Sequence, residues 1–279
     1  MPDPTADAAT GPPAIDPVVL TEVSDGIATI TMHRPEARNA INGAMGAQLP
    51  AAVAEMDARD DVAVMILTGA DPAFCAGADL KDLGSREGTG TDAMSVYDED
   101  GRLPYRGPFA PRTKVLIGAV NGPAITGGFE IALNCDFLVA SERARFADTH
   151  SRVGILPGWG LTVLLCQSVG VRRARELSAT GNYLSAQDAL TWGLVNHVVA
   201  HDDLLPFTRE LAAAVASNNG TAVGEMMRLY DRVVNSTGDD AWEVEAAVNV
   251  DWMRRMYDPA AVAARTGAVV ERGREQFRG

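Results

Sequence analysis

The sequence predicts an α/β core followed by a helical C-terminal region. Its 279 residues are 47% hydrophobic, which is enough to fill the core of a large α/β domain. In about the first two thirds, short apolar runs alternate with segments of helical periodicity, as in α/β proteins. Beyond Gly158 the periodicity is mostly helical.

The N-terminal half begins with a predicted hairpin. Residues 18–23 and 27–32 alternate apolar and polar side chains on either side of Asp25 and Gly26, a pair that favours a tight turn. Asn42 is expected to cap a helix over residues 43–58. Short apolar runs predict strands at residues 62–68 and 115–120, near 137–140 and 144–147, and at 195–199.

Helical periodicity dominates the second half of the chain. A glycine turn at Gly127 is expected to open an apolar helix. Further helices are expected at residues 159–168, 172–179, 185–192, 204–216, 222–234, 240–256 and 259–275.

The expected organisation has three parts. Residues 1–16 form a flexible leader rich in Pro, Ala and Asp, residues 17–215 form the α/β core, and residues 216–279 form the helical region. Within the core, residues 69–83 are a loop of small residues. The polar segment 85–112 is expected to be a mobile surface segment beside a pocket.

Composition excludes several classes of function. The formal net charge of −13 argues against nucleic-acid or membrane-surface binding, because both usually need a basic patch. Three scattered cysteines without a Cys/His cluster favour reduced thiols in the cytoplasm over disulfides or a metal site. The motifs of P-loop, dinucleotide-binding, zinc-protease and serine-hydrolase sites are absent from the sequence.

The first candidate motif pairs the turn at Gly127 and Gly128 with a carboxylate, Glu130. The backbone N–H groups that begin a helix attract anions, and an acid one turn further along can move protons beside them. The alternative is a tight turn whose glycines allow close packing, with Glu130 in a salt bridge. The apolar neighbours of Glu130 indicate that its side chain is partly buried, and a buried carboxylate needs a partner or a task.

Two further loops carry candidate residues. Residues 74–80 place Gly77 between two alanines, so the backbone there can approach a ligand closely. N–H groups from this loop and from the Gly127 turn can converge on one oxygen. His150 follows a predicted strand, in a loop with Asp148 and Arg152. A lone loop histidine is more often a surface residue, and the two charges beside it can simply be solvated.

Together these segments resemble the enoyl-CoA hydratase/isomerase, or crotonase, superfamily. The resemblance implies a spiral of ββα units with a helical C-terminal region that mediates trimerisation, as a homotrimer or a dimer of trimers. The matching segments, in order, are residues 33–41, 74–80, 115–136, 153–158 and 186–199.

The resemblance also implies a substrate and a site. The substrate is an acyl-CoA thioester, and no cofactor is implied beyond the coenzyme A that the substrate carries. The family's oxyanion hole, two backbone N–H groups, maps to Ala78 and Gly127. The first of two catalytic glutamates maps to Glu130, whereas His150 stands where the second is expected. The loops that contact coenzyme A map to Ala37, Arg38, Ala76, Asp79 and Leu80.

The expected reaction is hydration of a trans-2-enoyl-CoA to a 3-hydroxyacyl-CoA, with Glu130 and His150 beside the oxyanion hole. His150 departs from the two-glutamate pattern, so double-bond isomerisation, thioester hydrolysis and decarboxylation stay open as alternatives in the same family. A non-catalytic acyl-CoA-binding protein is the alternative from another class. The reaction is of the kind used in fatty acid β-oxidation, but the sequence does not give acyl chain length, branching or pathway.

Overall fold

The computed structural model describes residues 17–79, 107–234, 240, 247–251 and 254–255. Most of segment 85–112, the leader 1–16, Leu80 and the predicted helix 259–275 lie outside these residues. The chain divides into two compact units, Met1–Gly224 and Glu225–Gly279. All candidate site residues fall within the bounds of the first unit, and all of them except Leu80 are described.

The larger sheet of the described residues has six strands in the order β1-β2-β3-β4-β6-β9. Strands β1 and β2 form the predicted antiparallel hairpin, and β2, β3, β4, β6 and β9 are parallel to one another. The strand bounds are Val19–Ser24 for β1, Ile27–Met32 for β2, Val64–Gly69 for β3, Leu116–Val120 for β4, Phe137–Ser141 for β6 and His197–Val199 for β9.

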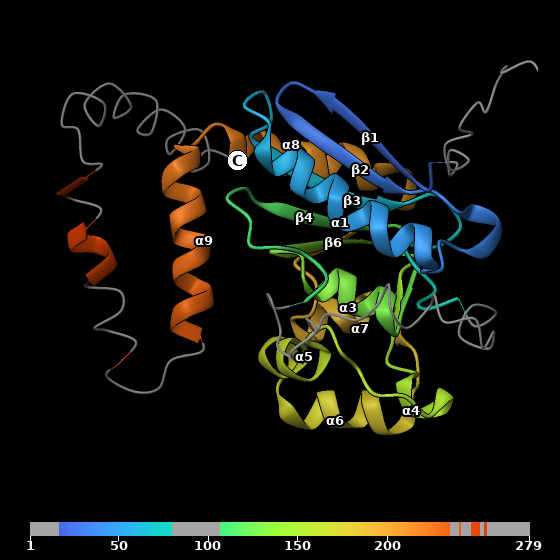
Figure 1. Cartoon of the computed structure of the whole chain (residues 1–279). Coiled ribbons are helices and arrows are strands. Elements are labelled where there is room, and N and C mark those ends of the chain that lie inside the picture. The colour runs from blue at the N-terminus through green and yellow to red at the C-terminus, as the bar shows by residue number, and fades with distance from the viewer. Residues whose placement is uncertain (1–16, 80–106, 235–239, 241–246, 252–253, 256–279) are drawn as a thin grey trace, which may run out of the picture. The chain divides into compact units, whose positions relative to one another are not determined.

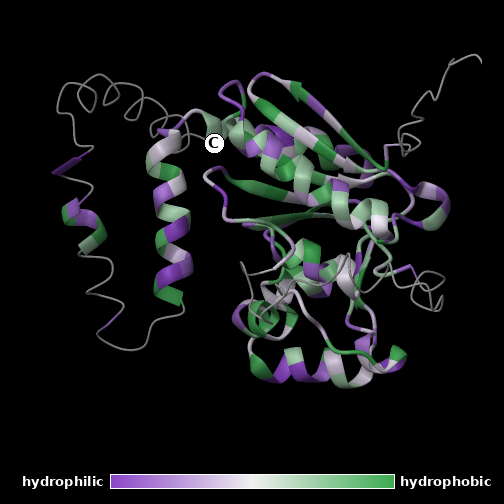
Figure 2. Ribbon diagram, viewed as in Figure 1, coloured by the Kyte–Doolittle hydropathy of each residue, from purple (hydrophilic) through white to green (hydrophobic). Residues whose placement is uncertain are grey.

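Helices cover both faces of this sheet (Figure 1). The main hydrophobic cluster joins Met65 and Leu67 of β3 to the buried side of α1 (Gly43–Ala58), which the Asn42 side chain caps as predicted. The intervening Ile66 is equally buried but faces the other side, where α8 (Leu204–Ala216) packs on β2, β3, β4 and β6. Burial on both sides explains why β3, β4 and β6 are largely apolar runs (Figure 2).

A second, three-stranded sheet in the order β5-β7-β8 lies below the first in Figure 1, among the shorter helices. Its strands are Pro123–Ile125 (β5), Arg145–Ala147 (β7) and Leu184–Ser185 (β8). The surrounding helices are Gly127–Leu133 (α3), His150–Val153 (α4), Leu161–Val169 (α5), Val171–Thr180 (α6) and Ala186–Trp192 (α7). Short 3-10 turns at Pro35–Ala37 (η1) and His201–Asp203 (η2) and the helix Gly220–Val234 (α9) complete the named elements.

Two local expectations were wrong or incomplete. His150 does not lie in a loop, because it is the first residue of α4, a helix of four residues. Strands β5 and β8 were not predicted, since three and two residues are too few to show a period. The short strand β5 matters for the site because only Thr126 separates its last residue, Ile125, from the start of α3 at Gly127.

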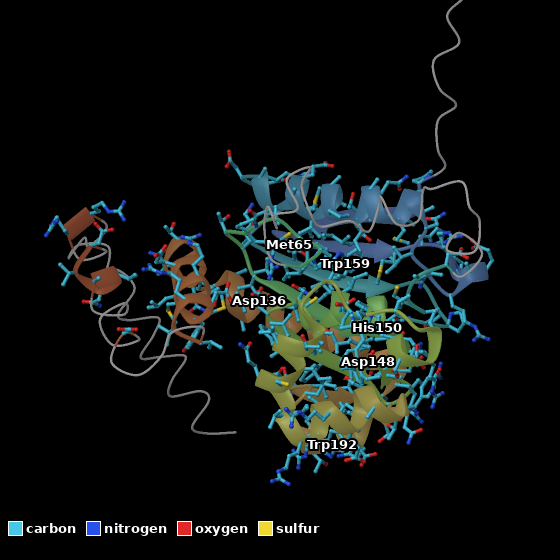
Figure 3. All side chains as sticks on the ribbon, turned by 60° about the horizontal axis from the view of Figure 1, so that its bottom comes forward. Met65, Asp136, Asp148, His150, Trp159 and Trp192 are labelled. Carbon is cyan, nitrogen blue, oxygen red and sulfur yellow. The ribbon has the colours of Figure 1, made fainter. Side chains whose placement is uncertain are left out.

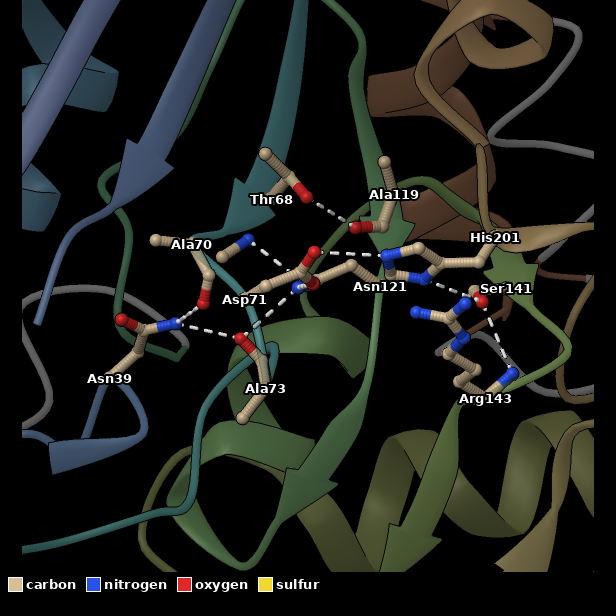
Figure 4. A network of polar contacts seen from close by, with 11 residues as sticks. Asn39, Thr68, Ala70, Asp71, Ala73, Ala119, Asn121, Ser141, Arg143 and His201 are labelled. Carbon is tan, nitrogen blue, oxygen red and sulfur yellow. Dashed lines mark hydrogen bonds and ion pairs between the residues drawn. The ribbon is translucent and has the colours of Figure 1, made fainter. Parts of the chain in front are cut away.

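A polar network holds the connection from β3 to the loop that carries Ala78 (Figure 4). The Asn39 amide donates to the carbonyls of Ala70 and Ala73, both at 2.7 Å. Asn121 donates to the Asp71 carboxylate at 2.9 Å, and His201 Nε2 lies 2.9 Å from the same carboxylate. The connection is therefore tied to the carboxyl ends of several strands before it reaches Ala78.

Candidate active site

Glu130 lies in α3 with its side chain buried, and the residue is 2% exposed. Its Oε1 accepts a hydrogen bond from the backbone N–H of Trp159 at 2.6 Å and a longer one from Leu161 at 3.5 Å. The Asn134 side chain donates to the Trp159 carbonyl at 2.8 Å, which clamps the same segment onto α3. One carboxylate oxygen is thus fixed by backbone amides.

His150 lies against the other oxygen of Glu130. Its Nε2 is 3.5 Å from Glu130 Oε2, and its Nδ1 is 2.6 Å from Asp148 Oδ1. His150 and Asp148, labelled in Figure 3, are 5% and 3% exposed, so neither is the solvated surface group that was the alternative. Arg152, by contrast, is exposed. The three side chains form a buried row of carboxylate, imidazole and carboxylate.

The protonation of this row follows from its contacts. Burial alone lowers the pKa of His150, but the hydrogen bonds and charges of Asp148 and Glu130 outweigh it and raise that pKa from 6.5 to about 9. Burial likewise pushes the pKa of Asp148 upward, and hydrogen bonds from His150 and Ser178 reverse this, leaving it below 3.8. At neutral pH the row holds an imidazolium next to a carboxylate.

The two proposed oxyanion-hole amides have defined directions. The Gly77 carbonyl accepts from the Ile41 N–H at 2.8 Å. Because C=O and N–H point in opposite directions across a trans peptide, the Ala78 N–H faces away from Ile41. The Thr126 carbonyl accepts from the Glu130 N–H at 2.9 Å, so the Gly127 N–H points out of the start of α3. Within the part of the chain that the structure describes, neither N–H donates a hydrogen bond.

Gly77 brings the two loops together. It has φ of +88°, and a Cβ there would lie 2.7 Å from the Ile125 carbonyl oxygen and 3.5 Å from the Gly127 nitrogen. A side chain at this position would therefore push the two loops apart. The sequence prediction that these loops converge agrees with this contact.

The residues that the resemblance assigned to coenzyme A lie on adjoining loops. The Ala76 N–H donates to the Arg38 carbonyl at 3.0 Å, and the Asp79 N–H donates to the Ile41 carbonyl at 2.9 Å. Ala37 ends the 3-10 turn η1, and Arg38, which follows it at φ of +52°, has an exposed side chain. The Asp79 carboxylate is 3.2 Å from the Arg34 guanidinium, a cross-loop ion pair that sequence reasoning missed. Leu80 lies outside the described residues.

Sequence reasoning also missed the backbone amides that hold Glu130. A backbone N–H is common to almost every residue, so no pattern marks the one at Trp159 as a ligand of a carboxylate. Trp159 itself is 6% exposed and belongs to the hydrophobic core cluster. The useful signal was indirect, since an acid in an apolar helix needs a partner.

A second row of polar side chains resembles a serine-hydrolase triad. Ser141 Oγ is 3.1 Å from His201 Nδ1, and His201 Nε2 is 2.9 Å from Asp71 (Figure 4). Ser141 is 0% exposed, and its hydroxyl accepts a hydrogen bond from the Arg143 N–H at 3.1 Å. A nucleophile needs access to its substrate, so we assign this row to the support of the β3 connection.

The described residues contain no group of three or more His, Cys, Asp and Glu side chains arranged to hold a metal ion. Across the same residues, no helix has the length and apolar character to cross a membrane. Cys75, Cys135 and Cys166 are free thiols.

Known proteins resemble the chain over most of its length. Residues 22–259 match the protein family described as enoyl-CoA hydratase/isomerase. A probable peroxisomal enoyl-CoA hydratase of Arabidopsis thaliana is 43% identical over 204 residues, which are 72% of this chain and 73% of the relative. The 1,2-epoxyphenylacetyl-CoA isomerase of Escherichia coli K12 is 30% identical over 94% of this chain and 98% of its own length.

Solved structures agree with the sequence relatives. The crystal structure of an enoyl-CoA hydratase from Mycobacterium smegmatis is 46% identical and has a TM-score of 0.69, covering 85% of this chain and 99% of that one. Fold and site thus define an α/β protein of the crotonase class. The chain belongs to the enoyl-CoA hydratase/isomerase family. The predicted family and fold class are confirmed, while trimerisation stays a prediction.

Proposed function

We propose that this protein hydrates a trans-2-enoyl-CoA to a 3-hydroxyacyl-CoA. The observation that carries the proposal is the buried contact, at 3.5 Å, between Glu130 on the helix that begins at Gly127 and His150 at the start of α4. A buried acid and an imidazole beside unpaired backbone amides are the parts that addition of water across a conjugated thioester needs. The name of the Arabidopsis relative supports the same reaction.

The thioester carbonyl is placed between the N–H groups of Ala78 and Gly127. As water adds to the β-carbon, negative charge moves onto this oxygen to give an enolate, and the two N–H groups stabilise it. Removing one donor of this kind typically costs about 10²–10³ in rate. The loops around Arg38 and Asp79 are proposed to hold the coenzyme A part of the substrate.

Glu130 and His150 move the protons. Glu130 takes a proton from water as its oxygen bonds to the β-carbon, and the imidazolium of His150 gives a proton to the α-carbon. Protonated Glu130 then returns its proton to His150 across their contact of 3.5 Å. Water and enoyl thioester are consumed, one 3-hydroxyacyl thioester is formed, and both side chains regain their starting charge.

The protonation of His150 suits this assignment. With a pKa near 9, the imidazole is cationic at neutral pH and has a proton to give. Asp148 fixes the ring through Nδ1, which leaves Nε2 directed at Glu130. An imidazolium thus takes the position that a second carboxylic acid occupies in the two-glutamate pattern.

The direct test is incubation of the purified protein with crotonyl-CoA. Hydration removes the conjugated double bond, so the enoyl absorbance falls and 3-hydroxybutyryl-CoA accumulates. Longer enoyl-CoA esters in the same assay measure the preferred chain length. Absence of hydration across the whole panel would contradict the proposal.

Double-bond isomerisation is the second candidate, because the matching family is described as enoyl-CoA hydratase/isomerase and His150 replaces the second acid. A 3-enoyl-CoA in the panel separates the two, since isomerisation creates the conjugated absorbance that hydration removes. Release of free thiol would instead reveal thioester hydrolysis. A pure acyl-CoA-binding protein would do none of these, and it would have no need for a buried acid and imidazole in contact.

The remaining parts of the proposal come from the family resemblance. We propose assembly as a homotrimer or a dimer of trimers, a cytoplasmic location, and catalysis with no cofactor apart from the coenzyme A of the substrate. Nucleic-acid partners are disfavoured by the net charge of −13. Light scattering of the purified full chain measures the assembly.

A further inference from the structure

Thr126 has a backbone conformation that β-branched residues avoid. Its φ is +55° and its ψ is −113°, directly before Gly127. Such a conformation is strained and persists only where the surrounding structure enforces it.

The side chain of Thr126 makes a contact that also breaks a local preference. Thr126 is the N-cap residue of α3, and Thr149 is the N-cap residue of α4. A threonine at this position usually accepts a hydrogen bond from its own helix, yet neither side chain does so here. Their hydroxyls instead bond each other, with 2.5 Å between the two Oγ1 atoms.

This bond joins the starts of two helices that carry the proposed chemistry. Helix α3 begins with Gly127 and contains Glu130, and α4 begins with His150. The Thr126 Cβ is also close to the third part of the site, at 3.3 Å from where a Cβ on Gly77 would lie. The backbone N–H of Thr126 donates to the Ala147 carbonyl at 2.9 Å, which anchors Thr126 to β7.

We infer that Thr126, through Thr149, is a positioning residue that sets the Gly127 amide relative to the imidazole of His150. The inference rests on the proposed function, because it assigns a purpose to the spacing of these two groups. If the two threonines had only a structural role, each side chain could cap its own helix, and neither does so. The direct link between the two helix starts instead fixes the parts of the site that act on one substrate.

The test compares two thioesters that differ in charge at the carbonyl. Acetoacetyl-CoA ionises to an enolate, which resembles the charge developed in the reaction, whereas butyryl-CoA is saturated and neutral at that position. The ratio of their dissociation constants reports how well the site is arranged for the transition state. It is measured for the wild type and for the variants Thr126→Val, Thr149→Val, the double variant, Thr126→Ser and Thr149→Ser.

The expected result has a defined pattern. Each single valine variant reduces the preference for acetoacetyl-CoA about tenfold, since misplacement of a site by about 1 Å can cost up to 10²-fold. The double variant loses no more than either single variant, because both remove the same bond. The serine variants keep the hydroxyl and retain the wild-type ratio. In crotonyl-CoA hydration, kcat falls in the valine variants while KM changes little.

A matched control is Thr208→Val in α8, since Thr208 is also buried and its hydroxyl donates to the Leu204 carbonyl. This variant is expected to keep the wild-type ratio. If the valine variants at positions 126 and 149 also keep it, or if binding of both thioesters weakens equally, the inference is overturned.

The two proposals fail separately. A wild type that prefers acetoacetyl-CoA but hydrates no enoyl-CoA would contradict the proposed reaction. The ratio of the two dissociation constants would still test the inference. A wild type without that preference would overturn the inference. If Thr126→Val does not fold, Thr149→Val carries the same prediction, because it leaves the strained residue unchanged.

Discussion

His150 Nε2 lies 3.5 Å from Glu130 Oε2, in a site where both residues are at most 5% exposed. Two such groups are stable in the interior only if their charges are balanced. The second contact of the imidazole, at 2.6 Å to Asp148, favours the cationic form that balances Glu130. At this distance, the negative charge of Glu130, the proposed base, and the proton on His150, the proposed acid, stabilise each other.

Replacing Glu130 with Gln is expected to abolish hydration of crotonyl-CoA. The amide keeps the size of the side chain but cannot take a proton from water, and general base catalysis typically contributes about 10²–10⁴ in rate. Binding of butyryl-CoA, measured by calorimetry, is expected to stay near the wild-type value, because the coenzyme A loops are untouched. Full turnover by this variant would remove Glu130 from the mechanism.

Replacing Asp148 with Asn is expected to move the pH profile. The carboxylate helps to hold the pKa of His150 near 9, so a neutral amide lowers that pKa toward its ordinary value of 6.5. The alkaline limb of kcat then shifts to lower pH, because His150 loses its proton earlier. Rates across pH 6–10 test this, and an unshifted limb would show that Asp148 does not control the imidazole.

Replacing His150 with Glu restores the two-glutamate pattern in sequence but not its surroundings. A carboxylate at position 150 would face Glu130 and Asp148 together, so three like charges would share one buried space. We expect loss of hydration, by about 10²-fold or more, and a lower thermal midpoint. A gain in hydration would contradict the part given to the imidazolium.

Stability is expected to fall between about pH 6.5 and pH 9. The pKa of His150 is higher in the folded protein than the ordinary 6.5, so its stabilising contribution is complete below pH 6.5 and is lost as pH rises through about 9. The contribution is on the order of 3 kcal/mol. Urea unfolding at several pH values measures it, with His150→Gln as the control that lacks this dependence.

Three other groups limit the pH range over which that measurement reports His150 alone. The pKa of Asp148 lies below 3.8, so its contribution is complete above pH 3.8 and is lost only under acid conditions. Burial raises the pKa of Cys75 and Cys135 to about 12, which destabilises the fold only from about pH 9 upward. A flat stability between pH 6.5 and pH 9 would contradict the assignment of His150.

The sequence predicted helices and strands well where a local signal, such as apolar periodicity or a helix cap, extends over several residues. Strand β2 and helix α1 have their predicted bounds, because apolar periodicity and the Asn42 cap are strong local signals. Strands β5 and β8 and helix α4 escaped prediction, because their existence depends on tertiary pairing. Local sequence cannot report a structure of two to four residues that only its neighbours stabilise.

The candidate site divides in the same way. Glu130 was predicted because a carboxylate in an apolar helix is conspicuous, and His150 because the family resemblance places the second acid at its position. The N–H of Trp159, the ion pair of Arg34 and Asp79, and the bond between two threonines were not. These contacts join residues that are far apart in the chain, and their residue types are ordinary on any surface.

Replacing Gly77 with Ala tests the approach of the two oxyanion-hole loops. The position has φ of +88°, and the added Cβ would lie 2.7 Å from the Ile125 carbonyl, so the loops must move apart. We expect hydration to fall by about 10²-fold, as for a lost oxyanion-hole donor, and unfolding to become easier by about 1–3 kcal/mol. Gly158→Ala is the control, because that position has open space and no positive φ. Wild-type kcat in Gly77→Ala would mean that Ala78 and Gly127 do not share one substrate oxygen.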